Sequence, residues 1–434
     1  MKRKTQIFSI PTNSLLKEKL LQWSSGFEEV IWLDSNEYFD QYSEFDAVLA
    51  VDALTVLKKK DTNDGFEALK EYQKTTNDYI FGYLSYDLKN ETEALISNNI
   101  DALAFDLLYF FQPKKIIYLK GNELIFSYLG MVDEEIESDL QEIQDTMIFE
   151  EHMNDVLQVC DRISRPDYLK KVETMQEYMH RGDIYEANLC MEFYAENATI
   201  NPLSIYKKLN AISTPPFATF LKLEGNYLLS ASPERYIKRK ETEVISQPIK
   251  GTAKRSTDEG EDKALIHTLK NDTKERAENI MIVDLVRNDL SHFATKGSVK
   301  VAELCEVYTF EQVHQLISTV VAEVPMDVNS VDLIKSTFPM GSMTGAPKIS
   351  AMNIIEELEE TKRGLYSGSV GYFEPNGDFD FNVVIRSILY NSTKQYASFS
   401  VGSAITSLSD PEKEYEECLL KANAMKRVLC EKVN

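Results

Sequence analysis

The sequence has few cysteines and no long apolar segment. Its 434 residues include five scattered cysteines, an odd number without paired spacing, which argues against a disulfide framework and predicts reduced thiols. The cysteines are Cys160, Cys190, Cys305, Cys418 and Cys430. No apolar run approaches the length of a membrane span, and Pro11 precedes any apolar core of a signal peptide. We therefore expect a cytoplasmic globular protein that is not inserted in a membrane.

Positive charge is also scarce. The chain has 47 lysines and arginines against 70 aspartates and glutamates, a formal net charge of −23. Such a chain repels nucleic acid and anionic membrane surfaces, so we expect neither as a partner. An anionic substrate would have to be held by local cations or by a metal ion. The hydrophobic fraction of 43% is enough for one large core or two ordinary ones.

The chain divides into two regions. In the first region, short apolar runs predict strands, which are mixed with helical segments. The predicted strands are Val30–Leu33, Ala47–Val51, Ile80–Leu84, Lys115–Leu119 and Leu124–Tyr128. An acidic, helical segment over residues 132–160 is typical of a solvated connector. We therefore expect an N-terminal region over residues 1–160 and a second region over residues 161–434.

The segment Ser232–Thr252 predicts a β-hairpin with its turn near Thr242. Glu234 and Lys250 lie eight residues on either side of that centre and just beyond strand ends marked by proline, so they should face one another. A carboxyl group and an amine held together away from water can transfer protons and support covalent catalysis. From this segment alone, a cross-strand ion pair on the surface is the alternative.

Two expected helices each carry a pair of glutamates. The helix that begins near residue 272 carries Glu275 and Glu278. The last helix, which begins near residue 410, carries Glu414 and Glu417. The spacing of three residues places each pair on one helix face. Four such carboxylates suit an oxygen-preferring cation such as Mg²⁺, and ordinary surface acid is the alternative.

A glycine-rich loop, G-S-M-T-G-A-P-K over residues 341–348, enters a helix that has Pro347 near its first position. Its free backbone N–H groups can bind an anion, a carboxylate as readily as a phosphate. Its spacing is not that of a nucleotide-binding P-loop, so ATP is not the favoured ligand.

Residues 366–405 predict three strands. In the middle strand the apolar positions from Phe379 to Leu389 form the core face, while Arg386 faces the other way. An arginine there is structural or solvated unless its face lines a cleft, where guanidinium suits bidentate binding of a carboxylate.

The second region resembles the chorismate-utilising enzymes, a family that includes anthranilate synthase component I, aminodeoxychorismate synthase component I, isochorismate synthase and salicylate synthase. The shared motifs are S-P-E-R (232–235), P-I-K-G-T (248–252), K-E-R-A-E-N-I-M-I-V-D-L-V-R-N-D (274–289), G-S-M-T-G-A-P-K (341–348), G-L-Y-S-G (364–368), N-V-V-I-R-S (382–387) and D-P-E-K-E-Y-E-E (410–417). Residues 81–87 also resemble the family's G-x-L-S-Y-D element. The resemblance implies an α/β fold of the α+β type, in which two antiparallel sheets pack across a core with helices outside and residues 1–160 are interleaved with the rest.

Two positions indicate the branch of the family that the chain resembles. Lys250 stands where anthranilate synthases carry alanine, and Glu186 stands where isochorismate and salicylate synthases carry the lysine that activates water. The resemblance is therefore to the aminodeoxychorismate synthase component I branch. It implies amination of chorismate to 4-amino-4-deoxychorismate in 4-aminobenzoate and folate biosynthesis. The chain has no glutaminase or lyase signature, so ammonia would come from a glutamine amidotransferase subunit, and a separate lyase would release 4-aminobenzoate.

The resemblance also implies the role of each site residue. Lys250 would be the nucleophile, with its pKa lowered, and Glu234 the general acid, with its pKa raised. Mg²⁺ would be held by Glu278 and Glu417, with Glu275 and Glu414 in support. The residues expected to bind chorismate are Gly251, Thr252, Thr344, Gly345, Tyr366, Arg386, Gly402, Lys421 and Gln315, of which Gln315 stands where some relatives have histidine.

Two other functions remain open. Anthranilate synthase component I would fit the same family but is disfavoured by Lys250. A catalytically silent chorismate-binding subunit would not need Glu234, Lys250 or the carboxylate pairs, so their presence disfavours it.

Overall fold

The computed structural model describes residues 2–11, 13–38, 41–61, 63–93, 95–148, 156–311 and 313–431. The helices are α1 Ser14–Ser24, α2 Gly65–Thr76, α3 Lys89–Thr92, α4 Ile136–Asp145, α5 Arg165–His180, α6 Pro202–Ser213, α7 Glu259–Asn271, α8 Thr273–Ser291, α9 Ser330–Thr337, α10 Lys348–Leu358 and α11 Pro411–Cys430. The strands are β1 Arg3–Ser9, β2 Glu29–Asp34, β3 Ala47–Lys59, β4 Ile80–Leu84, β5 Leu108–Lys120, β6 Glu123–Leu129, β7 Cys160–Asp161, β8 Glu186–Ala195, β9 Phe217–Leu223, β10 Asn226–Ser232, β11 Arg235–Lys240, β12 Glu243–Gln247, β13 Ile249–Lys254, β14 Lys300–Thr309, β15 Val313–Glu323, β16 Gly345–Ala346, β17 Ser369–Phe373, β18 Phe379–Asn382, β19 Ser387–Asn391 and β20 Tyr396–Thr406.

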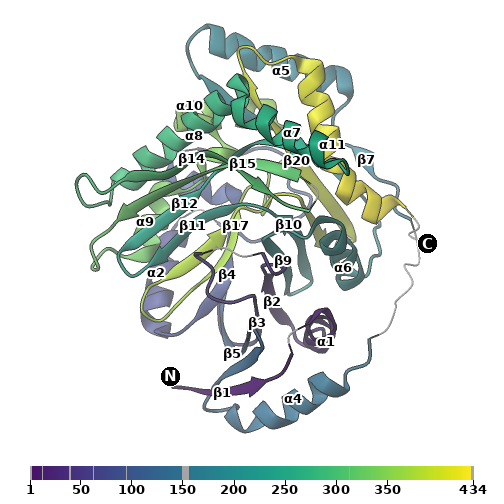
Figure 1. The fold of residues 1–434 in the computed structure, drawn as a ribbon, viewed down its shortest axis with the longest axis vertical. Coiled ribbons are helices and arrows are strands. Elements are labelled where there is room, and N and C mark those ends of the chain that lie inside the picture. The colour runs from purple at the N-terminus through teal and green to yellow at the C-terminus, as the bar shows by residue number, and fades with distance from the viewer. Residues whose placement is uncertain are drawn as a thin grey trace.

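The strands of the N-terminal and second regions pair with one another. β2 lies between β3 and β9, and β4 pairs with both β5 and β17, in each case antiparallel. Figure 1 shows β4, from the purple end of the chain, beside β17, which is yellow-green. The expected α/β fold with antiparallel strands is confirmed. The two regions share one hydrogen-bonded strand network, in which twenty strands of the described part of the chain take part.

The apolar side chains form two large buried clusters on opposite faces of the central strands. Along β3, Val48 and Ala50 belong to one cluster and Leu49 and Val51 to the other, because alternate side chains of a strand point to opposite faces. Residues of α2, α8 and α9 complete the first cluster. Residues of α1, α4, α5, α6, α10 and α11 complete the second. In Figure 1, α5, α10 and α11 lie at one end of the molecule and α1 and α4 at the other.

The two helices that carry glutamate pairs begin where the sequence predicts. The carboxylate of Asp272 accepts hydrogen bonds from the N–H groups of Lys274 and Glu275 at the start of α8. Asp410 caps α11 in the same way, with Pro411 in the first turn. In the acidic connector the helix is limited to α4, and residues 149–155 lie outside the described residues.

The expected middle strand of residues 366–405 is broken in two, so that prediction was wrong. β18 ends at Asn382, β19 begins at Ser387, and between them Arg386 takes a φ of 51°. The two halves have different neighbours, since β18 pairs with β11 and β17 whereas β19 pairs with β10 and β20. The break places the segment before Arg386 against Glu234, whose backbone C=O accepts a hydrogen bond from the N–H of Val383.

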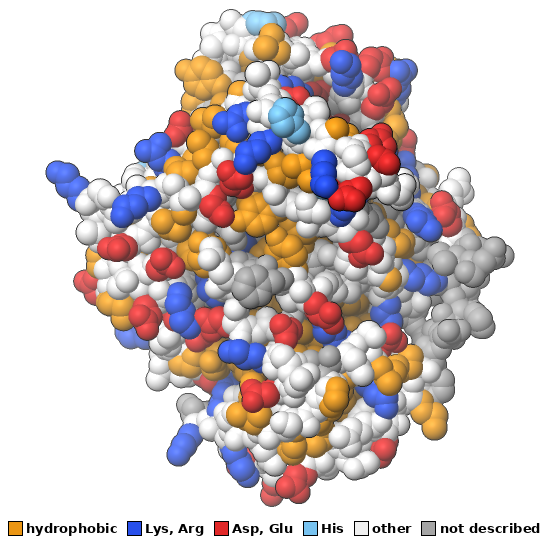
Figure 2. Space-filling view, in the orientation of Figure 1, with side chains coloured by type: hydrophobic (Ala, Val, Ile, Leu, Met, Phe, Trp, Pro, Cys, Tyr) orange, Lys and Arg blue, Asp and Glu red, His pale blue; other side chains and the backbone are white. Residues whose placement is uncertain are grey.

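Charged side chains of both signs are interspersed over the face shown in Figure 2. The net negative charge is therefore not gathered into one acidic patch on that face. Within the described ranges, no helix has both the length and the apolar character that crossing a membrane requires.

Candidate active site

The expected hairpin is present and its ends meet at a buried site. β11 pairs with β12, with Lys240 opposite Glu243, so the turn lies at residues 241–242 as predicted. Glu234 directly precedes β11, and Lys250 is the second residue of β13. The carboxylate of Glu234 accepts a hydrogen bond from the backbone N–H of Ile249. Glu234 and Lys250 therefore belong to one site, although each has a different direct partner.

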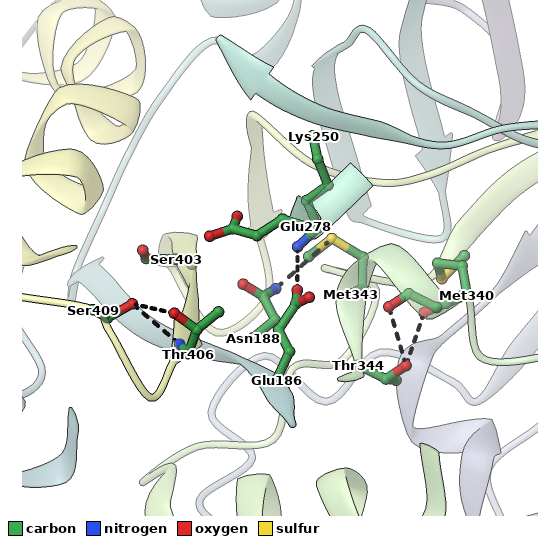
Figure 3. Close-up of polar contacts among 12 residues, drawn as sticks. Glu186, Asn188, Lys250, Glu278, Met340, Met343, Thr344, Ser403, Thr406 and Ser409 are labelled. Atoms are coloured by element: carbon green, nitrogen blue, oxygen red, sulfur yellow. Dashed lines mark hydrogen bonds and ion pairs between the residues drawn. The ribbon is translucent and has the colours of Figure 1, made fainter. Parts of the chain in front are cut away.

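Lys250 forms its ion pair with Glu186. The Lys250 Nζ lies 2.7 Å from the Glu186 Oε1, and the side chains are 11% and 1% exposed. Figure 3 shows Lys250 and Glu186 approaching from opposite sides, with the carboxyl group of Glu278 beside them. The alternative of a surface ion pair between Glu234 and Lys250 is excluded by this burial, and the expected direct facing of those two residues is replaced by the contact with Glu186.

The backbone holds Glu186 firmly. As the first residue of β8 it pairs with Ala346 of β16 on one side and with Thr406 of β20 on the other. Gly345 has a φ of 156°, and a Cβ there would lie 2.1 Å from the backbone oxygen of Glu186. Only glycine therefore lets the glycine-rich loop approach β8 so closely.

The charge state of Lys250 differs from the expectation. Burial alone would lower the pKa of Lys250, but the negative charge of Glu186 and its hydrogen bond outweigh burial, so the pKa is raised. Glu278 and Glu234 act in the same direction. The predicted lowering of the pKa was wrong because a carboxylate stands at position 186.

Glu234 has the expected character of an acid. Burial raises its pKa to about 7, although the Ser342 hydroxyl, which donates a hydrogen bond to it, and the charges of Lys250 and Arg386 act in the opposite direction. The residue is 4% exposed. A carboxyl group with this pKa is protonated in part of the molecules at neutral pH, as proton donation requires.

The two glutamate pairs have unequal environments. Glu278 is buried, its Oε1 has no hydrogen-bond partner, and burial raises its pKa to about 7. Glu414, in contrast, accepts hydrogen bonds from the Ser403 hydroxyl and from the Lys274 amine, so its carboxylate is occupied within the protein.

The other two glutamates lie close to the rim of the same site. Burial alone would raise the pKa of Glu417, but the charge of Lys421, 2.7 Å away, brings it below its usual value. The pKa of Glu275 is raised by burial and then by the charge of Glu417. The Oε2 of Glu275 lies 3.0 Å from where a Cβ on Gly251 would stand, and Gly251 has a φ of 89°.

These carboxylates have the oxygen donors that Mg²⁺ prefers. Oε1 of Glu278 has no hydrogen-bond partner and lies 3.7 Å from the Lys274 Nζ, and Mg²⁺ in proteins usually takes one or two carboxylates together with waters and substrate. Across the described part of the chain, no group of three or more acidic, histidine or cysteine side chains is gathered around one point. Glu278 and Glu417 as the residues that would hold Mg²⁺ therefore stay a prediction, and Glu414 is engaged by Ser403 and Lys274.

The strands around Lys250 carry further residues expected to bind chorismate. Thr252 of β13 pairs with Gln315 of β15, and a register shift between residues 249 and 252 sets Lys250 and Gly251 out of the regular pairing. Gln315 is buried and its Oε1 has no hydrogen-bond partner. This buried amide oxygen is therefore available to a ligand.

The remaining expected residues lie around β8 and β20. Thr344 donates its hydroxyl hydrogen bond to the backbone oxygen of Met340, so its side chain serves its own loop. Tyr366 is buried beside Cys190, whose thiol donates to the Tyr366 hydroxyl over 3.9 Å. Burial lowers the pKa of Arg386, opposed by the charge of Glu234.

Gly402 and Lys421 are in direct contact. The Lys421 amine donates to the backbone oxygen of Gly402 over 2.8 Å while pairing with Glu417. A Cβ on Gly402 would lie 2.7 Å from the Cys190 Sγ, so a larger residue there would displace the side chains of β8.

The sequence reasoning missed a buried arginine that ties the site together. Arg363 pairs with Glu359 and donates to the backbone oxygens of Met343 over 2.7 Å and Asn188 over 2.9 Å. It therefore joins β8 to the glycine-rich loop. Its position directly before G-L-Y-S-G was the available signal, since a charge beside buried motifs needs a partner.

The model of the family described as chorismate binding enzyme matches residues 16–427. The chain belongs to this family. "Aminodeoxychorismate synthase component 1" of Escherichia coli (strain K12) is 41% identical over 267 residues, which are 62% of this chain. That match spans 58% of the relative's length, so the chain covers a little over half of it.

Other relatives in the family carry other names. "Anthranilate synthase component I-like protein" of Synechocystis is 35% identical over 79% of this chain and 71% of its own. Among solved structures, anthranilate synthase component I from Streptococcus pneumoniae superposes with a TM-score of 0.79 at 26% identity, over 90% of this chain and 94% of the other. The expected anthranilate synthase component I-like fold is therefore confirmed. The menaquinone-specific isochorismate synthase from Escherichia coli, with a TM-score of 0.76 at 16% identity over 99% of this chain and 95% of the other, shares the fold.

Proposed function

We propose that this protein aminates chorismate to 4-amino-4-deoxychorismate, with ammonia as the nitrogen source. The observation that carries the proposal is Lys250, a buried amine in the same site as the protonatable Glu234, at a position where the resemblance separates the branches of the family. The 41% identity to a relative named aminodeoxychorismate synthase component 1 supports the same branch.

The site residues divide the chemistry between a nucleophile and an acid. The Lys250 amine attacks C2 of chorismate, the ring double bonds shift, and the C4 hydroxyl leaves as water with the proton of Glu234. Ammonia then attacks C4, the double bonds shift back, and the Lys250 amine leaves C2. The new nitrogen gives one proton to the Glu234 carboxylate, so both residues return to their starting states.

Binding depends on cations placed around an acidic site. Arg386 and the Lys421 amine would hold substrate carboxylates, and Gly251 and Thr252 would line the ring. Glu278 and Glu417 would hold Mg²⁺, which when bound supplies positive charge for a substrate carboxylate. Burial of Lys250 and Glu234 excludes water, which would otherwise compete with ammonia for the activated ring.

The proposal includes two protein partners. A glutamine amidotransferase subunit would supply the ammonia, consistent with the word "component" in the name of the E. coli relative. A separate lyase would convert the product to 4-aminobenzoate, which places the reaction in folate biosynthesis.

Anthranilate synthase component I is the second candidate. The Synechocystis relative and the S. pneumoniae structure favour it, since both carry that name. It would require Lys250 to be a spectator and amination to occur at C2. The two reactions therefore differ in the carbon that receives nitrogen.

A product assay distinguishes the two. Purified protein is incubated with chorismate, Mg²⁺ and ammonium, and the products are separated before and after addition of aminodeoxychorismate lyase. We expect 4-aminobenzoate only after the lyase is added. Anthranilate without lyase would overturn the proposal in favour of the second candidate, and no product with saturating ammonium would overturn both in favour of a silent binding subunit.

A further inference from the structure

The ion pair between Lys250 and Glu186 leaves one carboxylate oxygen unused. Oε1 of Glu186 accepts from the Lys250 Nζ over 2.7 Å, whereas Oε2 is buried and has no hydrogen-bond partner. A buried carboxylate in a structural ion pair normally has both oxygens satisfied. The free oxygen indicates that the pair is arranged for a further interaction.

Lys250 needs a proton acceptor because an ammonium group has no lone pair with which to attack carbon. Besides Glu186 of β8, three carboxyl groups interact with the charge of Lys250. They are Glu278 of α8, Glu234 before β11 and Glu417 of α11. Of these four, Glu186 receives the hydrogen bond from Nζ. Glu234 is the acid of the proposed reaction, and Glu278 and Glu417 would hold the metal ion.

We propose that Glu186 is the proton acceptor that converts Lys250 from an ammonium ion into the nucleophilic amine. This inference deepens the proposed function and rests on it. A glutamine at position 186 could not take the proton, because an amide is not basic. In this chain the proton of Lys250 therefore stays within the site, whereas with glutamine it must leave to solvent.

The proton balance closes over one cycle. One proton passes from Nζ to Oε1, which leaves a neutral amine and a neutral carboxyl group. The Nζ lone pair then forms the bond to C2. When ammonia has added at C4, the C2–N bond breaks and its electron pair returns to Nζ. The proton then moves back from Glu186, and the ion pair is restored without exchange with bulk water.

The Oε2 of Glu186, which has no hydrogen-bond partner, can take part in this cycle. After the transfer, the carboxyl group of Glu186 is neutral and can rotate its proton between the two oxygens, so one oxygen can accept a hydrogen bond from the N–H of the adduct. The backbone pairing of Glu186 with Ala346 and Thr406 keeps the carboxyl group within reach of Nζ through the cycle.

The first test is the pH dependence of kcat/KM for chorismate below pH 7, at a fixed concentration of free ammonia. For Glu186→Gln we expect an additional fall of about tenfold for each pH unit relative to the wild-type protein, because Lys250 must first lose its proton to solvent. The wild-type protein should lack this fall, since its proton transfer is internal. Glu186→Asp, which keeps an acceptor, should retain the wild-type profile at a lower rate.

Glu192→Gln is the matched control. Glu192 is a buried carboxylate of the same strand, but it pairs with Arg162 over 2.9 Å and lies outside the site. Its variant should keep the wild-type profile. A Glu186→Gln profile parallel to that of the wild-type protein, or a steep profile for Glu186→Asp, would overturn the proposal.

The second test does not depend on activity. Acetic anhydride labels only the neutral amine, so the labelling rate of the Lys250 peptide against pH, read by mass spectrometry, reports its protonation. We expect Glu186→Gln to move the midpoint to lower pH by about one unit or more, while Glu192→Gln leaves it unchanged. An unchanged midpoint in Glu186→Gln would overturn the inference. If the labelling midpoint shifts but ammonium yields no product, the link between Glu186 and the protonation of Lys250 is supported and the proposed function fails.

Discussion

Two buried lysines of this protein pair with carboxylates in quite different surroundings. Lys115 of β5 lies 2.6 Å from Asp139 and 2.6 Å from Glu135. The Tyr128 hydroxyl also donates to Asp139 over 2.8 Å, and the Lys115 ammonium stands over the ring of Tyr128. The hydrogen bonds and ring contact make this a satisfied structural network between β5 and α4.

Lys250 lies in a network that is incomplete. Three buried oxygens of the candidate site residues have no hydrogen-bond partner, the Oε2 of Glu186, the Oε1 of Glu278 and the Oε1 of Gln315. Because an unsatisfied buried oxygen costs folding free energy, such groups tend to persist where a ligand, ion or water completes them. Both lysines form ion pairs with carboxylates. What separates the structural lysine from the functional one is whether the oxygens around it have all their hydrogen bonds.

The largest expected effect is on catalysis at Lys250. Lys250→Ala should reduce ammonia-dependent amination by on the order of 10³-fold or more, because the nucleophile is removed. Lys250→Arg should lose as much activity while keeping a positive partner for Glu186, so its melting temperature should stay close to that of the wild-type protein. Steady-state rates and thermal melting measure both. Full activity in either variant would remove the distinction between the two lysines.

Lys115 should show the opposite pattern. Lys115→Met leaves Asp139 buried with the Tyr128 hydroxyl as its remaining close partner, and we expect a loss of about 3–5 kcal/mol in unfolding free energy. The rate of the folded protein should be unchanged. Urea unfolding measures the loss. Lys58→Met is the control, since Lys58 pairs with Glu224 at the surface and its removal should cost less than about 1 kcal/mol.

Glu234 should make the activity of the Lys250 site depend on pH. The proposed role requires its protonated form, and its pKa is about 7, so wild-type activity should fall as the pH rises above about 7. Glu234→Gln should lower the rate by about 10²-fold and abolish this fall, because the amide does not titrate. The measurement is kcat/KM against pH from 6 to about 9. Persistence of the same falling limb in the variant would assign it to another group.

The smallest expected effect of a substitution concerns the metal ligands. Glu278→Gln removes a carboxylate whose Oε1 has no hydrogen-bond partner, and we expect the Mg²⁺ concentration for half-maximal activity to rise by about tenfold or more. Chelation of Mg²⁺ should abolish activity in the wild-type protein, and excess Mg²⁺ should restore it. Glu414→Gln should have a weaker effect, since that carboxylate is held by Ser403 and Lys274. Equal metal requirements in all three proteins would contradict the assignment.

Local chemistry made much of the fold and part of the site predictable. Asp272 and Asp410 are strong caps, so the starts of α8 and α11 and the faces of their glutamates followed from spacing. The turn of the hairpin followed in the same way, because proline and polar residues mark the strand ends. The raised pKa of Glu234 followed from the role that the family resemblance implied.

Long-range pairing explains what the sequence did not reveal. Glu186 meets Lys250 because β8, β16 and β20 align in one register, and β13 comes to it from a separate hairpin. Without that register, the partner of Lys250 and its raised pKa could not be foreseen. The break before β19 depends likewise on two different sets of neighbouring strands, which the alternation of apolar residues does not encode.

The most direct test of the account is to look for the covalent bond at Lys250. Protein is mixed with chorismate and Mg²⁺ without ammonium, quenched in acid and digested, and the peptide that contains Lys250 is weighed. Without ammonia nothing displaces the lysine, so we expect this peptide to gain the mass of chorismate less one water, while the Lys115 peptide gains none. An unmodified Lys250 peptide from protein that aminates chorismate once ammonium is added would contradict the account.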